Sequence, residues 1–186
     1  MLYPNKIQKK SHHDIIYANR GMTLENIIND ANNYYLHNEL AVIYKKPTPI
    51  KIGKVNYSDK KVLVSGTLNQ KSTLDYVGIY KGKYIDFDAK STQNKTSFPL
   101  SNIHIHQINH MRNILKHGAI TFLIIEINQK YYILKGEYIL DFIDNSKRKS
   151  IPYNDILKYG YEIKCGYNPT LDYLNVLDRI YFKEGV

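Results

Sequence analysis

The sequence of 186 residues has no tryptophan, a single cysteine and no long apolar run. Because Cys165 has no second cysteine to pair with, an internal disulfide and a cysteine-based zinc site are both excluded, and a reducing compartment is expected. No apolar stretch approaches the ~20 residues of a membrane-spanning helix. Residues 1–10 are polar and basic and lack the apolar core of a secretion signal. We therefore predict a cytoplasmic protein without a membrane segment.

Acidic residues are also scarce relative to basic ones. Lys and Arg number 26 against 17 Asp and Glu, which leaves a formal net charge of +9. This surplus favours a polyanionic partner, since basic side chains that neutralise phosphates gain from counterion release. Solvated surfaces are often basic as well, so charge alone leaves nucleic-acid binding open. Hydrophobic residues make up 43% of the chain, enough for a single packed domain over residues 1–186.

Hydrophobic periodicity predicts a helix and then a strand after a basic arm at residues 1–20. Residues 23–36 carry apolar side chains at the spacing of a buried helical face, with Thr23 as the expected N-cap. Residues 40–44 are apolar and β-prone, and the prolines that follow should end this strand near position 46. Residues 47–72 alternate weakly, carry several lysines and lack a dense apolar run. We interpret this segment as a projecting β-rich insertion.

The rest of the chain alternates strands and helices. The expected strands cover residues 75–80, 83–89, 119–127 and 131–134, and the expected helices cover residues 101–116, 137–142, 153–159 and 171–182. A turn at residues 81–82 joins the first two strands, which should form the sheet centre. The first of these helices should be capped by Ser101 or Asn102 and run to Lys116, with Gly118 just past its end as the stop. This order indicates an α/β domain with a mixed central β-sheet flanked by helices.

Residues 86–90, Asp-Phe-Asp-Ala-Lys, carry the side chains with the clearest chemistry. In a strand, Asp86, Asp88 and Lys90 face one side. Asp75 precedes the predicted turn, so its strand can bring a second carboxylate beside Asp88. Mg²⁺ takes one or two carboxylates, and a neighbouring Lys can stabilise the charge that develops when a phosphodiester is cleaved. On the pattern alone, an exposed sheet face with an ion pair is the more frequent arrangement.

An acid followed on the next strand by [Asp or Glu]-x-Lys resembles the PD-(D/E)xK nuclease superfamily. Longer blocks of the sequence resemble a narrower family, the RecU-type Holliday junction resolvases. The blocks are residues 18–25 (ANRGMTLE), 45–49 (KKPTP), 72–76 (STLDY), 84–90 (YIDFDAK), 94–100 (NKTSFPL) and 104–107 (HIHQ). The likeness thins beyond Tyr161, so we draw nothing from it for the C-terminal tail.

The resemblance implies an endonuclease that cuts four-way DNA junctions by paired, symmetric nicks in recombination and repair. It implies Mg²⁺ as the cofactor, with Mn²⁺ able to substitute, and a homodimer as the working form. The implied fold is a restriction-endonuclease-like core with a protruding stalk, which residues 47–72 match. A recombinase and a branch-migration motor are implied as further partners.

The resemblance also assigns roles to individual positions. The implied metal ligands are Thr73, Asp75, Asp88 and Gln107. Lys90 would stabilise the transition state, and Glu25 would add a carboxylate to the catalytic set of Lys90, Asp75 and Asp88. The family usually has Glu where this chain has Asp88, and the shorter side chain moves the ligand oxygens back by one methylene. The candidate DNA-binding residues are Arg20, Lys45, Lys46, Lys51 and Lys54.

Several of these residues have a simpler structural interpretation. Glu25 could serve only to favour the first turn of its helix, and Thr73 could serve only to favour a β backbone. Gln107 shares a helical face with apolar residues and needs a polar partner there, which favours a site role. His106 and His110 have the spacing of a helical zinc pair but lack the acidic base of the metalloprotease motif, so zinc is not expected.

Two other functions stay open. With Asp88 as the weak point, the chain could be a catalytically weak or inactive architectural protein that binds junctions. It could also be a related nuclease that acts on flaps or duplex DNA. The retained Asp75, Lys90 and Gln107 favour an active enzyme over the architectural protein.

Overall fold

The computed structural model describes residues 23–47, 50–58, 61–68 and 73–182. For residues 50–58 and 61–68 it describes the backbone and not the side chains. The predicted arm at residues 1–20, with Arg20, lies outside the described residues. The helices are α2 (Leu24–His37), α3 (Ile105–Lys116), α4 (Gly136–Asn145), α5 (Tyr153–Tyr159) and α6 (Tyr173–Tyr181), with a short 3₁₀ helix at Leu100–Asn102. The strands are β1 (Val42–Lys45), β2 (Ile50–Ser58), β3 (Lys61–Leu68), β4 (Tyr76–Tyr80), β5 (Lys83–Ser91), β6 (Ser97–Pro99), β7 (Ile120–Ile127), β8 (Lys130–Lys135), β9 (Ser150–Pro152) and β10 (Tyr161–Ile163).

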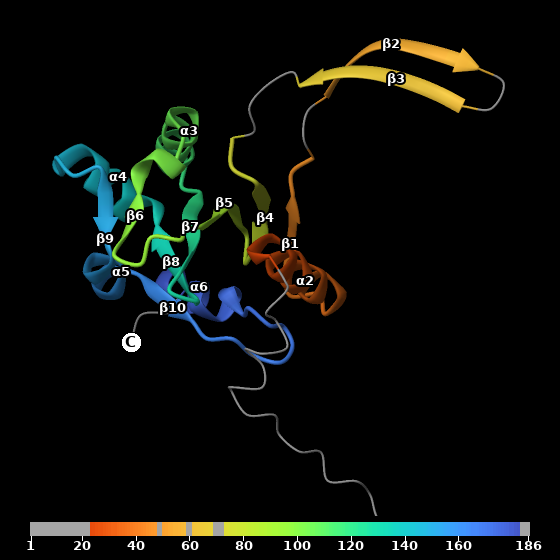
Figure 1. The fold of residues 1–186 in the computed structure, drawn as a ribbon. Helices are drawn as coiled ribbons and strands as arrows, with labels where there is room; N and C mark the ends of the chain where they lie inside the picture. The colour runs from red at the N-terminus through yellow and green to blue at the C-terminus, as the bar shows by residue number, and fades with distance from the viewer. Residues whose placement is uncertain (1–22, 48–49, 59–60, 69–72, 183–186) are drawn as a thin grey trace, which may run out of the picture.

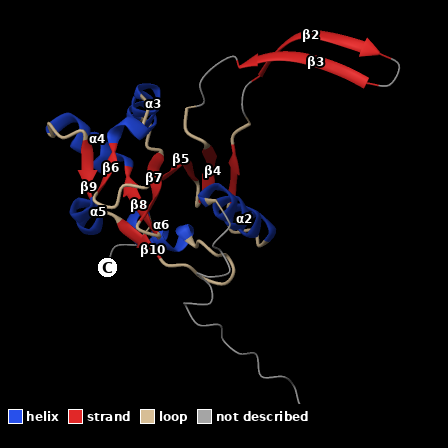
Figure 2. Ribbon diagram, viewed as in Figure 1, coloured by secondary structure: helices blue, strands red, loops and turns tan. Residues whose placement is uncertain are grey.

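Six strands form one mixed sheet in the order β1-β4-β5-β7-β8-β10. β5 and β7 pair in parallel, and the other neighbours pair antiparallel. Helices cover both faces of this sheet, as Figures 1 and 2 show. The predicted α/β class is therefore confirmed. The sheet centre was predicted only partly: β5 lies there beside β7, whereas β4 is one strand from the edge, because the apolar β7 takes the central place.

Two apolar layers hold the helices to the sheet. One lies under α2 and α6 and contains Phe87, whose ring stacks between those of Tyr76 and Phe122 at centroid distances of 4.9 Å and 4.6 Å. The other lies under α3 and α4 and contains Met111 and Leu123. Phe122 and Leu123 are consecutive residues of β7 and lie in opposite layers, because the side chains of a strand alternate between its two faces.

The start of α2 was predicted correctly, and the start of α3 was not. Thr23 caps α2, since its side-chain oxygen accepts a hydrogen bond from the Asn26 backbone N–H at 3.3 Å. Ser101 and Asn102 lie instead in the 3₁₀ helix, and His104 is the N-cap of α3. The predicted end of α3 is confirmed, because the helix stops at Lys116 and Gly118 follows in the left-handed region at φ +77°.

Tight turns join two hairpins, one of them at the predicted residues 81–82. Lys81 and Gly82 both have positive φ, 46° and 73°, as do Asn128 and Gln129 at 53° and 60°. Positive φ at both central residues is the two-residue turn that matches the twist of antiparallel strands. The predicted pairing of β4 with β5 follows, and β7 pairs with β8 in the same way.

The insertion at residues 47–72 is rich in β structure, as predicted. β2 and β3 pair with each other in a two-stranded sheet that is separate from the six-stranded one, and their ribbons stand apart from it in Figure 1. The side chains of Lys51 and Lys54 lie outside the described residues, so a role of this segment as a stalk on DNA stays a prediction. Across the residues that the structure describes, no helix has the length and apolar character needed to cross a membrane.

Candidate active site

Asp86, Asp88 and Lys90 lie on the face of β5 that is turned toward α3. Phe87 and Ala89 lie on the opposite face, in or against the apolar layer under α2. Strand alternation was therefore predicted correctly. The alternative of an exposed sheet face is wrong, because the side chains of Asp86 and Asp88 are fully buried.

Asp75 lies directly before β4, opposite Asp88 on the neighbouring strand. The register pairs Tyr76 with Phe87, and one step further along an antiparallel ladder brings Asp75 to Asp88. Burial raises the pKa of the Asp75 carboxyl, and the nearby Asp88 carboxylate raises this pKa further. The ammonium groups of Lys90 and Lys45 act in the opposite direction. Two adjacent carboxylates of this kind attract a cation.

Three donors hold the Asp88 carboxylate. Gln107 Nε2 donates to Oδ2 at 2.5 Å, and Lys90 Nζ lies 2.9 Å from the same oxygen. The Ala89 backbone N–H donates to Oδ1 at 2.8 Å. About a fifth of the Lys90 side chain is exposed. Lys90 therefore lies between the buried Asp88 carboxylate and the solvent.

Gln107 is a buried polar residue whose two amide atoms both have partners. Its Oε1 accepts a hydrogen bond from the His104 backbone N–H at 3.1 Å, which completes the capping box of α3, while its Nε2 goes to Asp88. The predicted need for a polar partner is confirmed. Gln107 thus joins the start of α3 to the site, and its service as a metal ligand stays a prediction.

Two consecutive lysines lie on opposite faces of the sheet. Lys45 pairs with Tyr76 in the register and faces α2, where its Nζ lies 2.5 Å from Glu25 Oε2. Lys46 faces α3, where its Nζ donates to Thr73 Oγ1 at 2.9 Å. Strand alternation explains the split, since neighbouring side chains point to opposite faces.

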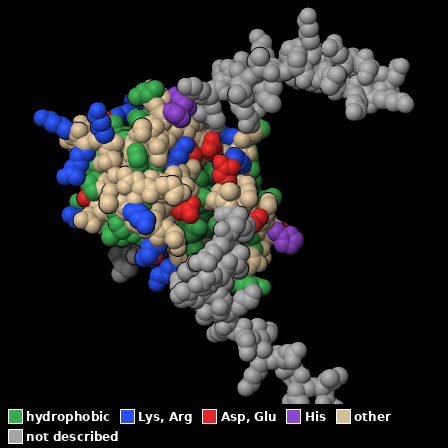
Figure 3. All heavy atoms as spheres, in the orientation of Figure 1, with side chains coloured by type: hydrophobic (Ala, Val, Ile, Leu, Met, Phe, Trp, Pro, Cys, Tyr) green, Lys and Arg blue, Asp and Glu red, His purple; other side chains and the backbone are tan. Residues whose placement is uncertain are grey.

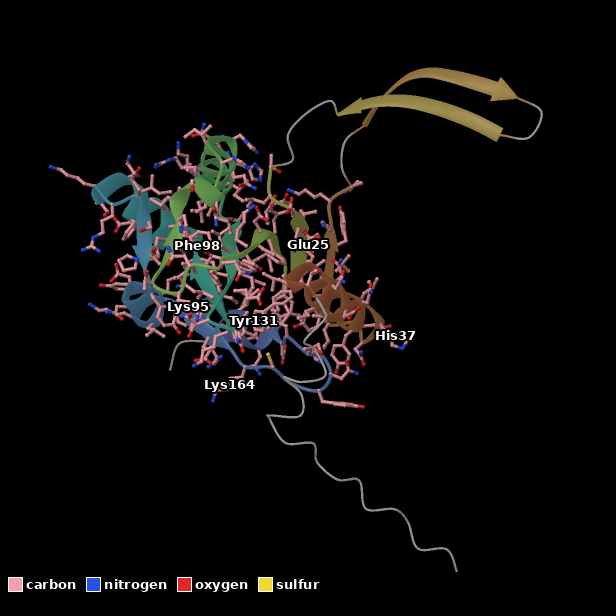
Figure 4. All side chains as sticks on the ribbon, in the orientation of Figure 1. Glu25, His37, Lys95, Phe98, Tyr131 and Lys164 are labelled. Atoms are coloured by element: carbon pink, nitrogen blue, oxygen red, sulfur yellow. The ribbon has the colours of Figure 1, made fainter. Side chains whose placement is uncertain are left out.

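Glu25 lies in the first turn of α2 and is exposed; Figure 4 labels it beside the start of α2. Among the described residues its carboxylate has one ion pair, with Lys45. Lys45 in turn acts on the Asp75 carboxyl. The structure therefore connects Glu25 to the carboxylate pair through a lysine, and a catalytic role for Glu25 stays a prediction.

The buried Asp86 carboxylate has contacts that the sequence analysis did not foresee. Its Oδ2 lies 2.7 Å from Lys46 Nζ, 2.9 Å from His110 Nε2 and 3.0 Å from the Tyr84 hydroxyl. A usable signal was present, because His110 follows Gln107 by three positions and such residues are neighbours on a helix. Gln107 and His110 therefore reach Asp88 and Asp86 side by side.

His106 and His110 have different partners. His110 contacts Asp86, while the His106 ring stacks on His104 at a centroid distance of 5.4 Å. In the described part of the chain, no three His, Cys, Asp or Glu side chains form a group that could hold a metal ion by themselves. The site instead offers the two carboxylates of Asp75 and Asp88, which fits a Mg²⁺ ion that keeps waters and binds substrate oxygens.

Figure 3 shows acidic side chains next to basic ones on the face of the molecule between α2 and α3. Acidic and basic side chains are therefore neighbours on this face. A mixed sheet that brings Asp75, Asp88 and Lys90 together is the arrangement of a nuclease-like core.

Comparison with known proteins identifies the family. The model of the RecU family, described as Recombination protein U, matches residues 19–179. The Holliday junction resolvase RecU of Bacillus mycoides is 46% identical over 186 residues, which cover 96% of this chain and 92% of the relative. The proteins of the same name from Bacillus cytotoxicus and Bacillus cereus are 44% and 45% identical, over 97% and 96% of this chain and 92% of each relative.

The chain belongs to the RecU family. The likeness was expected to thin beyond Tyr161, and the family match continues past this residue into α6. Tyr173 and Leu177 of α6 are buried in the same apolar layer as α2.

Proposed function

We propose that this protein is a structure-specific endonuclease that resolves four-way DNA junctions by metal-dependent phosphodiester hydrolysis in recombination and repair. The observation that carries the proposal is the carboxylate pair of Asp75 and Asp88 with the Lys90 ammonium 2.9 Å from Asp88. Its relatives are named Holliday junction resolvases, and the net charge of +9 suits a polyanionic substrate.

The cofactor in this proposal is Mg²⁺, with Mn²⁺ able to substitute. Asp75 and Asp88 would hold it, with Thr73 and Gln107 as the further ligands that the family resemblance implies. A bound divalent ion would supply positive charge at the phosphate and make water a better nucleophile.

The residues of the chain supply the remaining chemistry. Lys90 has three N–H donors, of which Asp88 takes one, so the others can meet the charge that grows on the phosphate oxygens. Water attacks phosphorus, the bond from phosphorus to the 3′ oxygen breaks, and the products are a 3′-hydroxyl and a 5′-phosphate. Lys45 and Lys46 would bind neighbouring phosphates and so position the strand.

A substrate panel tests the proposal against its two alternatives. Labelled four-way junction, flap and linear duplex are incubated with the protein in Mg²⁺, Mn²⁺ or EDTA. We expect metal-dependent nicks on the junction and none on the duplex. Cleavage of flaps or duplex at a similar rate would favour the related nuclease, and binding without cleavage would favour the architectural protein.

Asp88→Glu tests the departure of this chain from its family. In the structure Asp88 has partners on both oxygens, and an extra methylene in so buried a place costs about 1–3 kcal/mol of stability. We expect Asp88→Glu to nick the junction within about tenfold of the wild-type rate and to change the preference between Mg²⁺ and Mn²⁺. Nicking that appears only in Asp88→Glu would show that the natural site is inactive.

The working form that we propose is a homodimer, because two symmetric nicks need two sites related by a two-fold axis. An exposed apolar row beside the site supports a contact between copies. Val42, Ile79 and Tyr84 are paired in register across β1, β4 and β5, and they are 56%, 59% and 43% exposed. The partners proposed beyond this, a recombinase and a branch-migration motor, follow from the family resemblance alone.

Ile79→Lys should weaken this dimer by at least about tenfold, because it places a charge in a desolvated contact. Sedimentation of the variant at several concentrations measures the change. The matched control is Leu157→Lys, which alters a similarly exposed apolar residue on α5. A dimer that survives Ile79→Lys unchanged would place the contact elsewhere.

A further inference from the structure

A second buried carboxylate lies beside the proposed metal site. Asp86 precedes Asp88 by two residues on the same face of β5, and its side chain is fully buried. The reaction proposed above uses Asp88 and does not use Asp86. Burial of a carboxylate is unfavourable unless it is paired, so the partners of Asp86 indicate what it does.

All the partners of Asp86 meet one of its two oxygens. Lys46, His110 and Tyr84 gather at Oδ2, whereas Oδ1 is buried with no hydrogen-bond partner among the described residues. The Lys46 ammonium makes the shortest of the three contacts, at 2.7 Å. Because the ammonium makes this shortest contact, the arrangement suits a carboxylate that holds a lysine.

Lys46 is attached to the segment that carries Asp75. Its backbone N–H donates to the Asp75 carbonyl oxygen at 2.7 Å, and its Nζ donates to Thr73 Oγ1 at 2.9 Å. The Lys46 ammonium has three N–H donors. Within the described residues, two of them make hydrogen bonds, to Thr73 and Asp86. About a fifth of the Lys46 side chain is exposed, so the third N–H can contact a bound substrate.

We propose that Asp86 is a positioning residue that fixes the Lys46 ammonium beside Thr73, so that its third N–H binds a phosphate oxygen of the strand being cut. The inference rests on the proposed function and deepens it. The site would then hold two ammonium groups, Lys90 on Asp88 and Lys46 on Asp86. Both carboxylates are on one face of one strand, so the spacing of the two ammonium groups is set by β5.

A double-mutant cycle on the full chain tests this role. The readout is the single-turnover nicking rate on a labelled four-way junction at saturating Mg²⁺. Asp86→Asn keeps the side-chain size but removes the charge that holds the ammonium, and we expect about a hundredfold slower nicking. Lys46→Met should lose a similar factor. Adding Asp86→Asn to Lys46→Met should cost less than about threefold, because Asp86 acts through Lys46.

Two further measurements separate positioning from folding. The junction dissociation constant in Ca²⁺ should change by less than about threefold for Asp86→Asn, because many other phosphate contacts remain. The matched control is Asp178, which accepts hydrogen bonds from Lys81 at 2.6 Å and from Tyr80 at 3.0 Å far from the site. Asp178→Asn and Lys81→Met should nick within about twofold of wild type.

The outcomes are distinct. Nicking by Asp86→Asn at the wild-type rate, or an undiminished hundredfold loss in the Lys46→Met background, overturns the positioning role while the proposed function stands. A wild-type protein that leaves the junction intact in Mg²⁺ and Mn²⁺ overturns the proposed function and the inference with it. If Asp86→Asn does not fold, Asp86→Glu carries the same cycle, with an expected loss of about tenfold from the shifted carboxylate.

Discussion

Lys90→Ala and Asp75→Ala should each slow nicking of a four-way junction by about a hundredfold to a thousandfold. Lys90 is the ammonium that reaches from the buried Asp88 to the solvent side, and Asp75 is the carboxylate opposite Asp88. Lys90→Ala removes a positive charge beside the phosphate, and Asp75→Ala removes a carboxylate that would hold the metal ion. Binding of the junction should stay within about threefold, because many basic residues share that work. Single-turnover gels and a binding titration in Ca²⁺ measure the two quantities.

Lys130→Ala is the control for this pair. Lys130 also has a carboxylate partner, Glu162 at 3.3 Å, but it lies at the turn between β7 and β8. Its replacement should leave nicking unchanged. If Lys90→Ala lost binding and nicking together, Lys90 would serve the fold of the site and not the chemical step.

Gln107→Ala should raise the Mg²⁺ concentration needed for half-maximal nicking by about tenfold to a hundredfold, since residues that orient a metal ligand contribute this much. Gln107 donates to Asp88 and accepts from the His104 backbone. The alanine variant should also lose about 1 kcal/mol of stability with the cap of α3. A metal titration of the nicking rate and a thermal unfolding curve measure the two effects.

Gln107→Glu separates the two roles of this residue. It keeps an oxygen for the His104 N–H and so keeps the cap, but it replaces the donor to Asp88 with a negative charge. The new carboxylate lies beside the buried Asp88 carboxylate, so we expect a loss of stability without metal and a changed metal requirement. An unchanged metal requirement in both variants would limit Gln107 to the capping of α3.

The carboxylate pair was predictable because it depends on local rules. Strand alternation puts Asp88 and Lys90 on one face, and a two-residue turn at Lys81 and Gly82 brings the preceding strand back in register, with Asp75 opposite Asp88. Both rules act over a few residues. The same holds for the start of α2, where the Thr23 side chain caps the helix.

The start of α3 could not be predicted from capping preference. Ser101 and Asn102 are better N-cap residues than His104, but the buried Ile103 is extended and separates the 3₁₀ helix from α3. The cap is completed by Gln107, whose other end is held by Asp88 of β5. Tertiary contact therefore decided where the helix begins.

The meeting of Lys46 with Asp86 was beyond sequence reasoning for a similar reason. Lys46 follows β1, and His110 belongs to α3. The periodicity of a single segment does not predict that residues from these two elements contact the same residue of β5. The full burial of Asp86 and Asp88 was hidden as well, since the pattern Asp-Phe-Asp-Ala-Lys is typical of a strand with one exposed face. Here α3 covers that face.

The most direct test of the account is a map of the nicks on a four-way junction labelled in turn on each of its four strands. We predict nicks at symmetry-related positions of two opposing strands, with 5′-phosphate ends, that appear with Mg²⁺ and vanish with EDTA and in Lys90→Ala. Nicks that persist in EDTA, that fall on one strand alone, or that occur equally on linear duplex would contradict a metal-dependent resolvase.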